Sequence, residues 1–210
     1  MTSAAVVVPV KAFGAAKVRL ASALGPAERA ALARRLAEIV VRAAAPLPAL
    51  VVCDDDEVRA WAEGVGARVV WCPGRGLNGA VADGLAALRA DGVETAIVAH
   101  GDLPLATRLD WVAQFPDVTL VPDRRFDGTN VAGVPTGAGV RFSYGAGSFA
   151  RHRREAARLG LAARIVPDPM LGWDVDLPAD LAWPDDPGAG TGAAPVTPPR
   201  YAQARRPTTA

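Results

Sequence analysis

The sequence has few cysteines and few aromatic side chains. Its 210 residues include two cysteines, and aromatic residues make up 6% of the chain. Cys53 and Cys72 each stand at the end of an apolar run and form no C-x-x-C pair, so neither a disulfide framework nor a zinc site is expected. We interpret both as reduced, half-buried residues.

The chain also lacks an excess of charge of either sign. Lys and Arg number 23 against 22 Asp and Glu, which disfavours a nucleic-acid-binding protein and confines any phosphate chemistry to a local site. No apolar run approaches the roughly 20 residues of a membrane helix, and the first residues lack the pattern of a signal peptide. We therefore expect a cytoplasmic protein without membrane contact.

Lysine is scarce among the basic residues. Only Lys11 and Lys17 are lysines, and they lie six residues apart in a chain whose other cations are arginines. A lysine is expected to persist in such a chain where a compact point charge is needed rather than a planar guanidinium. This favours a functional site in the segment that holds both lysines.

Short β-branched runs alternate with helical stretches, which is typical of an α/β sheet with mostly parallel strands. Strands are expected at residues 5–10, 49–53, 67–72, 95–100, 118–122, 130–134 and 163–166. Helices are expected at residues 26–44, 57–64, 80–90 and 148–159. Residues 184–210, rich in Pro, Gly and Ala, are expected to be a disordered tail, which leaves residues 1–183 as one domain.

The segment after the first expected strand suits a polyphosphate. It begins at Pro9, and Lys11, Lys17 and Arg19 place three cations within nine positions among small residues that let a ligand approach the backbone. No Gly-Lys-Ser/Thr run occurs, so a P-loop is disfavoured. We expect this segment to bind a triphosphate. The alternative interpretation is a solvated basic turn that binds no ligand.

The segment from Gly74 to Gly79 matches G-x-G-x-x-G but follows the third expected strand. A dinucleotide site would normally follow the first strand, so that interpretation is disfavoured. We predict instead a loop that curls around a base or ribose, with Gly76 and Asn78 as nucleotide contacts and the Asn78 amide as a directional donor and acceptor. A structural glycine turn is the alternative.

Three aspartates are candidate magnesium ligands. Asp102 follows a glycine at the carboxyl end of the expected strand at residues 95–100, where a carboxylate can hold a cation that bridges phosphate oxygens; a helix N-cap is the alternative. Asp174 and Asp176 point to the same side of an extended segment, so either would complete the site. Such a D-x-D pair also occurs in sugar-nucleotide glycosyltransferases.

A second anion site is expected around Thr129 and the segment from Gly145 to Ser148. That segment begins a basic helix, whose free N–H groups and positive dipole end would form an anion-binding site. The Thr129 hydroxyl would add a neutral hydrogen-bond donor. A capped basic helix with solvated arginines is the alternative.

Six motifs occur in order between residues 6 and 181: P-V-K-x5-K-x-R-L, G-L-N, H-G-D-L-P, D-G-T-N, Y-G-x-G-S-F-x-x-H and D-V-D-x-P-x-D-L. Together they closely resemble the guanylyltransferase family of coenzyme F420 biosynthesis. The resemblance implies a single-domain nucleotidyltransferase of the sugar-nucleotide-pyrophosphorylase-like, Rossmann-like α/β fold, with a mixed, mostly parallel sheet flanked by helices. Val18 and Leu177 stand where the family usually has Ser and Thr, and neither change removes a charge.

The resemblance also implies an activity. A Mg2+-dependent enzyme would condense phosphoenolpyruvate with GTP to give enolpyruvoyl-2-diphospho-5'-guanosine and pyrophosphate, with hand-over of the product to the next transferase. The acid substrate would bind at Thr129, Gly145 and Ser148, and Mg2+ at Asp102 with Asp174 or Asp176. Alternatives are the same reaction on 2-phospho-L-lactate or 3-phosphoglycerate, a glycosyltransferase, and a non-catalytic nucleotide-binding module.

Charge neutralisation is the main catalytic requirement of such a reaction, because both substrates are highly anionic. The candidate catalytic residues are Lys11, Lys17, Arg19 and Asp102. The candidate nucleotide contacts are Pro9, Lys17, Gly76 and Asn78.

Overall fold

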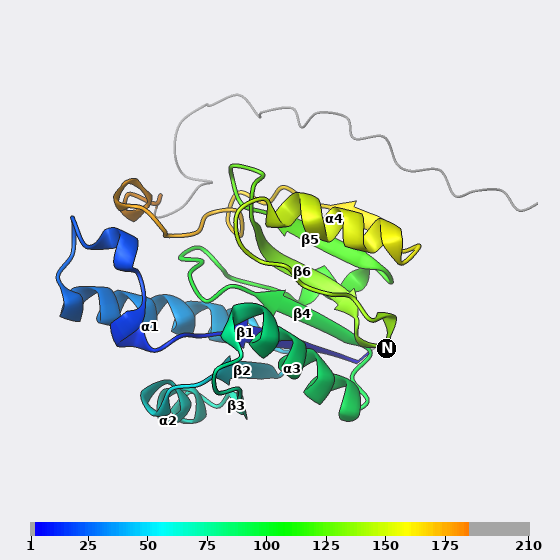
Figure 1. Cartoon of the computed structure of the whole chain (residues 1–210), viewed down its shortest axis with the longest axis horizontal. Coiled ribbons are helices and arrows are strands. Elements are labelled where there is room, and N and C mark those ends of the chain that lie inside the picture. Colours follow the sequence, from blue (N-terminus) through cyan, green and yellow to red (C-terminus); the bar gives the residue numbers. More distant parts are fainter. Residues whose placement is uncertain (1–2, 185–210) are drawn as a thin grey trace, which may run out of the picture.

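The computed structural model describes residues 3–184, and the tail expected at residues 184–210 lies outside them from residue 185 onward. The described chain forms one seven-stranded sheet in the order β3-β2-β1-β4-β6-β5-β7 (Figure 1). The strands are β1 (Ala4–Pro9), β2 (Ala49–Cys53), β3 (Arg68–Trp71), β4 (Thr95–Ala99), β5 (Val118–Pro122), β6 (Thr129–Pro135) and β7 (Ala163–Ile165). The α-helices are α1 (Pro26–Ala43), α2 (Asp56–Gly64), α3 (Gly76–Ala90) and α4 (Ser148–Arg158).

The expected mixed, mostly parallel sheet is confirmed. Strand β1 pairs in parallel with β2 and β4, β2 with β3, and β5 with β7, whereas β6 runs antiparallel to both β4 and β5. The reversal of β6 has a direct consequence for the site. It brings Thr129, the first residue of β6, beside Pro122 at the carboxyl end of β5 and to the same edge as the carboxyl end of β4.

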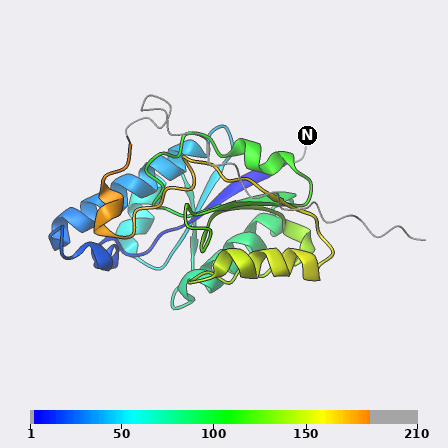
Figure 2. The same ribbon diagram turned by 90° about the horizontal axis from the view of Figure 1, so that it is seen from above.

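Both faces of the sheet are covered. On one face α1, α2 and the 3-10 helix at Asp110–Gln114 cover side chains such as Val6 and Val8, and on the other α3 and α4 cover Ala5 and Val7. Figure 2 shows α3 and α4 on the opposite side of the sheet from α1. Burial on both faces explains the nearly continuous apolar runs of the strands.

The expected elements occur within one residue of their boundaries, with the exception of α3. It begins at Gly76 rather than at residue 80, so the prediction of a loop through Gly79 is wrong. Gly74 and Gly76 adopt positive φ angles of 69° and 59°, and these two residues turn the chain from β3 into the helix. Asp102 does not cap a helix, because the next helical turn starts at Asp110.

The two cysteines are free, as expected, but both are buried at 3% exposure rather than half-buried. Cys53 packs on the α1 and α2 face of the sheet, and Cys72 on the α3 and α4 face. No helix between residues 3 and 184 is long and apolar enough to cross a membrane.

Replacing Gly84 in α3 by alanine is expected to destabilise the protein. The added Cβ would lie 2.8 Å from a methyl of Val52 and 2.9 Å from a methyl of Val7. Alanine gains up to about 1 kcal/mol over glycine in a helix, whereas overpacking a core costs about 1–3 kcal/mol, so we expect a net loss. The control is Gly64→Ala in α2, whose Cβ has no neighbour within 4 Å. A Tm for Gly84→Ala at or above that of the wild type would contradict this packing.

Candidate active site

A cleft of about 630 Å³ lies at the edge of the sheet where β1 and β4 end and β6 begins. Its walls come from segments far apart in the sequence: the turn after β1, the turn after β4, the loop before β6, the turn before α4 and the D-x-D segment. The carboxyl edge of a parallel sheet is where α/β folds of this kind bind ligands. The cleft is therefore the candidate active site.

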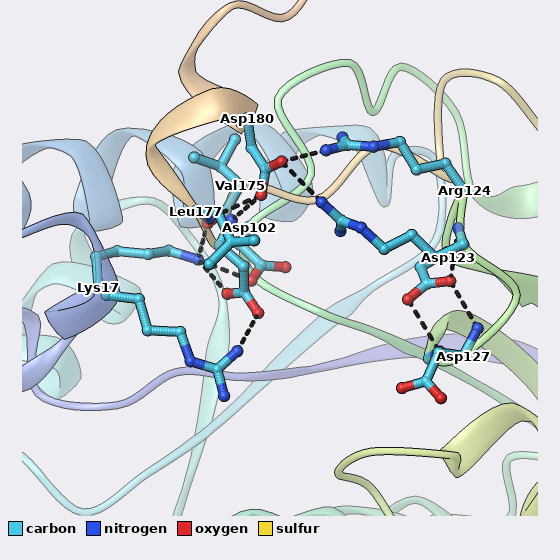
Figure 3. A network of polar contacts seen from close by, with 12 residues as sticks. Lys17, Asp102, Asp123, Arg124, Asp127, Val175, Leu177 and Asp180 are labelled. Atoms are coloured by element: carbon cyan, nitrogen blue, oxygen red, sulfur yellow. Dashed lines mark hydrogen bonds and ion pairs between the residues drawn. The ribbon is translucent and has the colours of Figure 1, made fainter. Parts of the chain in front are cut away.

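Lys17 connects three of these segments (Figure 3). Its Nζ donates hydrogen bonds to Asp102 Oδ2 at 2.8 Å and to the carbonyl oxygen of Val175 at 2.7 Å, and it lies 3.7 Å from Asp176 Oδ1. The Lys17 side chain is 10% exposed, and its backbone is in the left-handed region with φ of 55°. The structure therefore brings the lysine segment and the acidic residues to one point. A non-glycine residue with such a φ is uncommon, and here it directs the side chain toward the carboxylates.

The carboxylates at this point differ in their electrostatics. Burial opposes ionisation of Asp102, but the charges and hydrogen bonds around it, those of the Lys17 ammonium foremost, together outweigh burial and hold the pKa of Asp102 below its usual value. Burial raises the pKa of Asp174 to about 6, with the negative charges of Asp102 and Asp176 adding to the effect. A further cation near Asp174 would therefore be stabilised.

Two carboxylate oxygens of this cluster are buried without a hydrogen-bond partner: Asp102 Oδ1 and Asp174 Oδ1. Within residues 3–184, no three His, Cys, Asp or Glu side chains form a ready-made metal site. Mg2+, however, is usually held by one or two carboxylates together with substrate phosphates and waters. The two unpaired oxygens, with Asp176 beside them, are thus the groups of the cleft that could hold a divalent cation.

The other expected cations lie at the rim of the cleft. Arg19 contributes an exposed guanidinium 3.4 Å from Asp176 Oδ2, and Lys11 is also exposed. Pro9, the last residue of β1, lines the cleft with them. Exposed cations in this position are able to meet an anionic ligand as it enters.

The two residues of α3 expected to contact the nucleotide do not line the cleft. Leu77 lines the cleft, whereas Gly76 and Asn78 are not among its lining residues. Asn78 Oδ1 accepts a hydrogen bond from the backbone N–H of Tyr144 at 2.7 Å. Asn78 thus holds the segment before α4 against α3, a role that the sequence did not indicate.

Two buried hydroxyl groups face the cleft at its other end. The backbone N–H of Thr129 donates to Ser148 Oγ at 3.2 Å, and the ring Nδ1 of His152 lies 3.0 Å from Thr129 Oγ1. Gly145, with φ of 113°, lines the cleft beside them. The three residues expected to bind an acid are therefore adjacent to one cavity.

The prediction that free backbone N–H groups at the amino end of α4 bind an anion is wrong. The backbone N–H of Gly147 donates to both carboxylate oxygens of Asp127 at 3.0 Å, and that of Phe149 donates to the Asp127 carbonyl at 3.0 Å. Ser148 N–H donates to the carbonyl of Gly145 at 3.0 Å. The protein itself therefore uses these N–H groups, and the hydroxyls are the donors left for a ligand.

Two aspartates that anchor the site were missed or only partly recognised in the sequence. Asp123 accepts hydrogen bonds from the backbone N–H groups of Arg125, Asp127 and Gly128, which shapes the loop before β6. The D-x-x-x-D-G spacing of this loop is a turn signal that could have found it.

Asp180 is the second anchor and is fully buried. It lies in the 3-10 helix Pro178–Leu181. Its carboxylate accepts from the N–H groups of Asp176 and Leu177 at 2.9 and 2.7 Å, and it pairs with Arg124 and with Arg125 (Figure 3). It therefore ties the D-x-D segment to the loop before β6.

Comparison of sequences identifies related proteins over most of the chain. A phosphoenolpyruvate guanylyltransferase of Sphaerobacter thermophilus is 38% identical, covering 86% of this chain and 91% of the relative. One of Chloroflexus aggregans is 36% identical, with coverage of 81% and 91%. A 2-phospho-L-lactate guanylyltransferase of Halorubrum lacusprofundi is 37% identical, with coverage of 79% and 77%.

Solved structures share the fold. A putative nucleotide-diphospho-sugar transferase of Desulfovibrio desulfuricans superposes with a TM-score of 0.67 at 18% identity, covering 86% of this chain and 85% of the other. A cytidylyltransferase of Leptospira borgpetersenii gives a TM-score of 0.58 at 13% identity, with coverage of 86% and 84%. The family model described as "Guanylyl transferase CofC like" matches residues 4–183. This chain belongs to the CofC-like guanylyl transferase family.

Proposed function

We propose that this protein transfers a guanylyl group from GTP to phosphoenolpyruvate, giving enolpyruvoyl-2-diphospho-5'-guanosine and pyrophosphate in coenzyme F420 biosynthesis. The observation that carries the proposal is the convergence of Lys17 with Asp102 and Asp176 in the same cleft as the buried hydroxyls of Thr129 and Ser148. Such a cleft has cations for a triphosphate at one end and neutral donors for an acid at the other. The names of the relatives agree with this assignment.

The reaction needs charge neutralisation more than proton transfer. A phosphate oxygen of phosphoenolpyruvate attacks the α-phosphorus of GTP, the bond from that phosphorus to the α,β-bridging oxygen breaks, and pyrophosphate leaves with the electron pair. The attacking phosphate is already ionised at neutral pH, so no general base is required. Lys11, Lys17 and Arg19 reduce the repulsion between the two anions, and Thr129 and Ser148 hold the nucleophile in place.

Mg2+ is the proposed cofactor. The unpaired buried oxygens of Asp102 and Asp174 fit a hard cation, with Asp176 as a further ligand. When bound, the ion would supply neutralisation of the phosphate oxygens of GTP. Pro9 is retained as a proposed nucleotide contact and Gly145 as a proposed contact of the acid, because both line the cleft, whereas Gly76 and Asn78 do not.

The identity of the acid has one alternative with support, because one relative is named for 2-phospho-L-lactate. A mixed phosphoanhydride product also implies a following transferase that uses it as an activated donor, which we propose as a partner. Likeness of fold to a sugar-nucleotide enzyme supports no glycosyl transfer here, since identity to that structure is 18%.

The proposed activity is tested by pyrophosphate release. The protein is incubated with each of GTP, ATP, CTP and UTP, in every combination with phosphoenolpyruvate, 2-phospho-L-lactate and 3-phosphoglycerate, with and without Mg2+. We expect release only with GTP and Mg2+, and fastest with phosphoenolpyruvate. Tight GTP binding without release on any acid would contradict the proposal and favour a nucleotide-binding module.

Asp102→Asn is expected to lower kcat by about 100-fold or more, since it removes the carboxylate that faces both Lys17 and the proposed cation. The matched control is Asp56→Asn, a highly exposed aspartate of α2 remote from the cleft. Pyrophosphate release and thermal melting are measured for both. If Asp102→Asn were folded and kept wild-type turnover with normal Mg2+ dependence, the assigned role of Asp102 would be wrong.

Asp174→Asn is expected to stabilise the fold at pH 7.5 while reducing turnover. The pKa of Asp174 in the folded protein, about 6, exceeds the 3.8 of an unperturbed aspartate, so the folded state binds this proton more tightly than the unfolded state does. The resulting stability is present below about pH 4 and is lost as the pH rises through about 6. The gain in Tm from the substitution should therefore shrink as the pH falls from 7 toward 4. A variant less stable than the wild type at pH 7.5 would refute this.

A further inference from the structure

The hydroxyls of Thr129 and Ser148 can each donate or accept a hydrogen bond, and which they offer to a ligand depends on their partners in the protein. Thr129 and Ser148 are each only 2% exposed, so the partners around them decide which they do. One of those partners is His152 of α4, a buried residue to which the proposed function assigns no role.

The position of the proton on His152 follows from the hydrogen bond at its far nitrogen. The backbone N–H of Ser143 donates to His152 Nε2 at 3.0 Å, and a backbone N–H has no other role to play. Nε2 is therefore the acceptor, the ring is neutral, and its proton is on Nδ1. Burial, together with the nearby charge of Arg151, lowers the pKa of His152 to about 4, so the ring is neutral at pH 7.

Two N–H groups determine the direction at the two hydroxyls: the Nδ1–H of His152 at Thr129, and the backbone N–H of Thr129 at Ser148. Nδ1–H donates to Thr129 Oγ1 at 3.0 Å, and the backbone N–H of Thr129 donates to Ser148 Oγ at 3.2 Å. Each hydroxyl oxygen thus already accepts from the protein. Across residues 3–184, neither hydroxyl donates to another protein group, and both line the cleft. Their protons are left for a ligand.

Packing keeps the imidazole in this orientation. The rings of Phe142 and Tyr144 meet it edge to face, with centroid distances of 5.1 and 4.9 Å. Ser143, between them in the sequence, supplies the donor to Nε2. The side chain is therefore held on both sides and cannot exchange the roles of its two nitrogens without losing both hydrogen bonds.

We propose that His152 is a positioning residue that fixes the Thr129 hydroxyl as a hydrogen-bond donor toward the cleft. Together with the Ser148 hydroxyl, whose direction the Thr129 backbone N–H fixes, it forms a subsite for a carboxylate or phosphate oxygen of the acid substrate. This rests on the proposed function and extends it by naming what sets the chemistry of the acid subsite. Two directed neutral donors suit an oxygen that only accepts.

Two substitutions separate the hydrogen bonds of His152. In His152→Asn the side-chain amide nitrogen takes the place of Nδ1 and keeps a donor to Thr129. In His152→Gln the longer side chain places its carbonyl oxygen near the former Nε2 and keeps an acceptor for Ser143. We expect His152→Gln to raise the KM for phosphoenolpyruvate by about 10-fold or more, and His152→Asn by less than about 3-fold, with the KM for GTP unchanged in both.

The opposite ranking, with Asn more damaging than Gln, would overturn the proposal, because it would show that His152 acts by holding Ser143. A coupling experiment gives a second criterion. In a Thr129→Val background there is no hydroxyl to direct, so His152→Gln should add no further rise in KM. A full additional rise there would likewise overturn it.

A third measurement does not depend on activity and is made on the wild-type protein. The sequence contains two histidines, so 15N-labelled imidazole resonances of the wild-type protein are readily assigned by comparison with His100→Gln. We expect His152 to carry its proton on Nδ1 at pH 7, with and without phosphoenolpyruvate. A proton on Nε2 would refute the proposal. Absence of pyrophosphate release by the wild type would instead refute the proposed function and leave this result unaffected.

Discussion

The Lys17 ammonium is the contact on which the arrangement of the cleft depends. It joins the turn after β1, Asp102 after β4 and the carbonyl of Val175 through hydrogen bonds of 2.7 and 2.8 Å. Three carboxylates gathered in a partly buried space repel one another, and the Lys17 ammonium among them offsets that repulsion. The compact ammonium reaches both an oxygen of Asp102 and the Val175 carbonyl, which a planar guanidinium would do less readily.

The two ends of the cleft use different chemistry. At the lysine end, charges of opposite sign meet, and two carboxylate oxygens still lack a partner. At the other end, Thr129 and Ser148 offer neutral donors, whose directions are set by the neutral His152 ring at Thr129 and by the Thr129 backbone N–H at Ser148. Between them, Asp180 and Asp123 are used to fix backbone and arginine groups rather than to face a ligand. A transfer between two anions needs both ends: charge to bring them together and directed donors to orient one against the other.

Much of this protein could be predicted from its sequence because the signals are local. Alternating apolar runs and helical spacing located the strands and helices, and the scarcity of lysine singled out the segment that holds Lys17. Spacing alone could not reveal that β6 runs antiparallel and brings Thr129 to the site edge. It also could not show that Asp127 already satisfies the N–H of Gly147, or that α3 begins at Gly76, since both depend on partners distant in the chain.

The sequence by itself determined the class of fold, the segments that carry charge, and the residue types available for phosphate chemistry, because each follows from near neighbours along the chain. The tertiary structure alone decided which of these groups lie in contact and which of them carry a proton. The raised pKa of Asp174 comes from burial beside residues brought in by folding. The proton of His152 is placed by a backbone group nine residues away in sequence. Burial and hydrogen-bond partners exist only once the chain has folded, and these two set the protonation and direction of every polar group in the cleft.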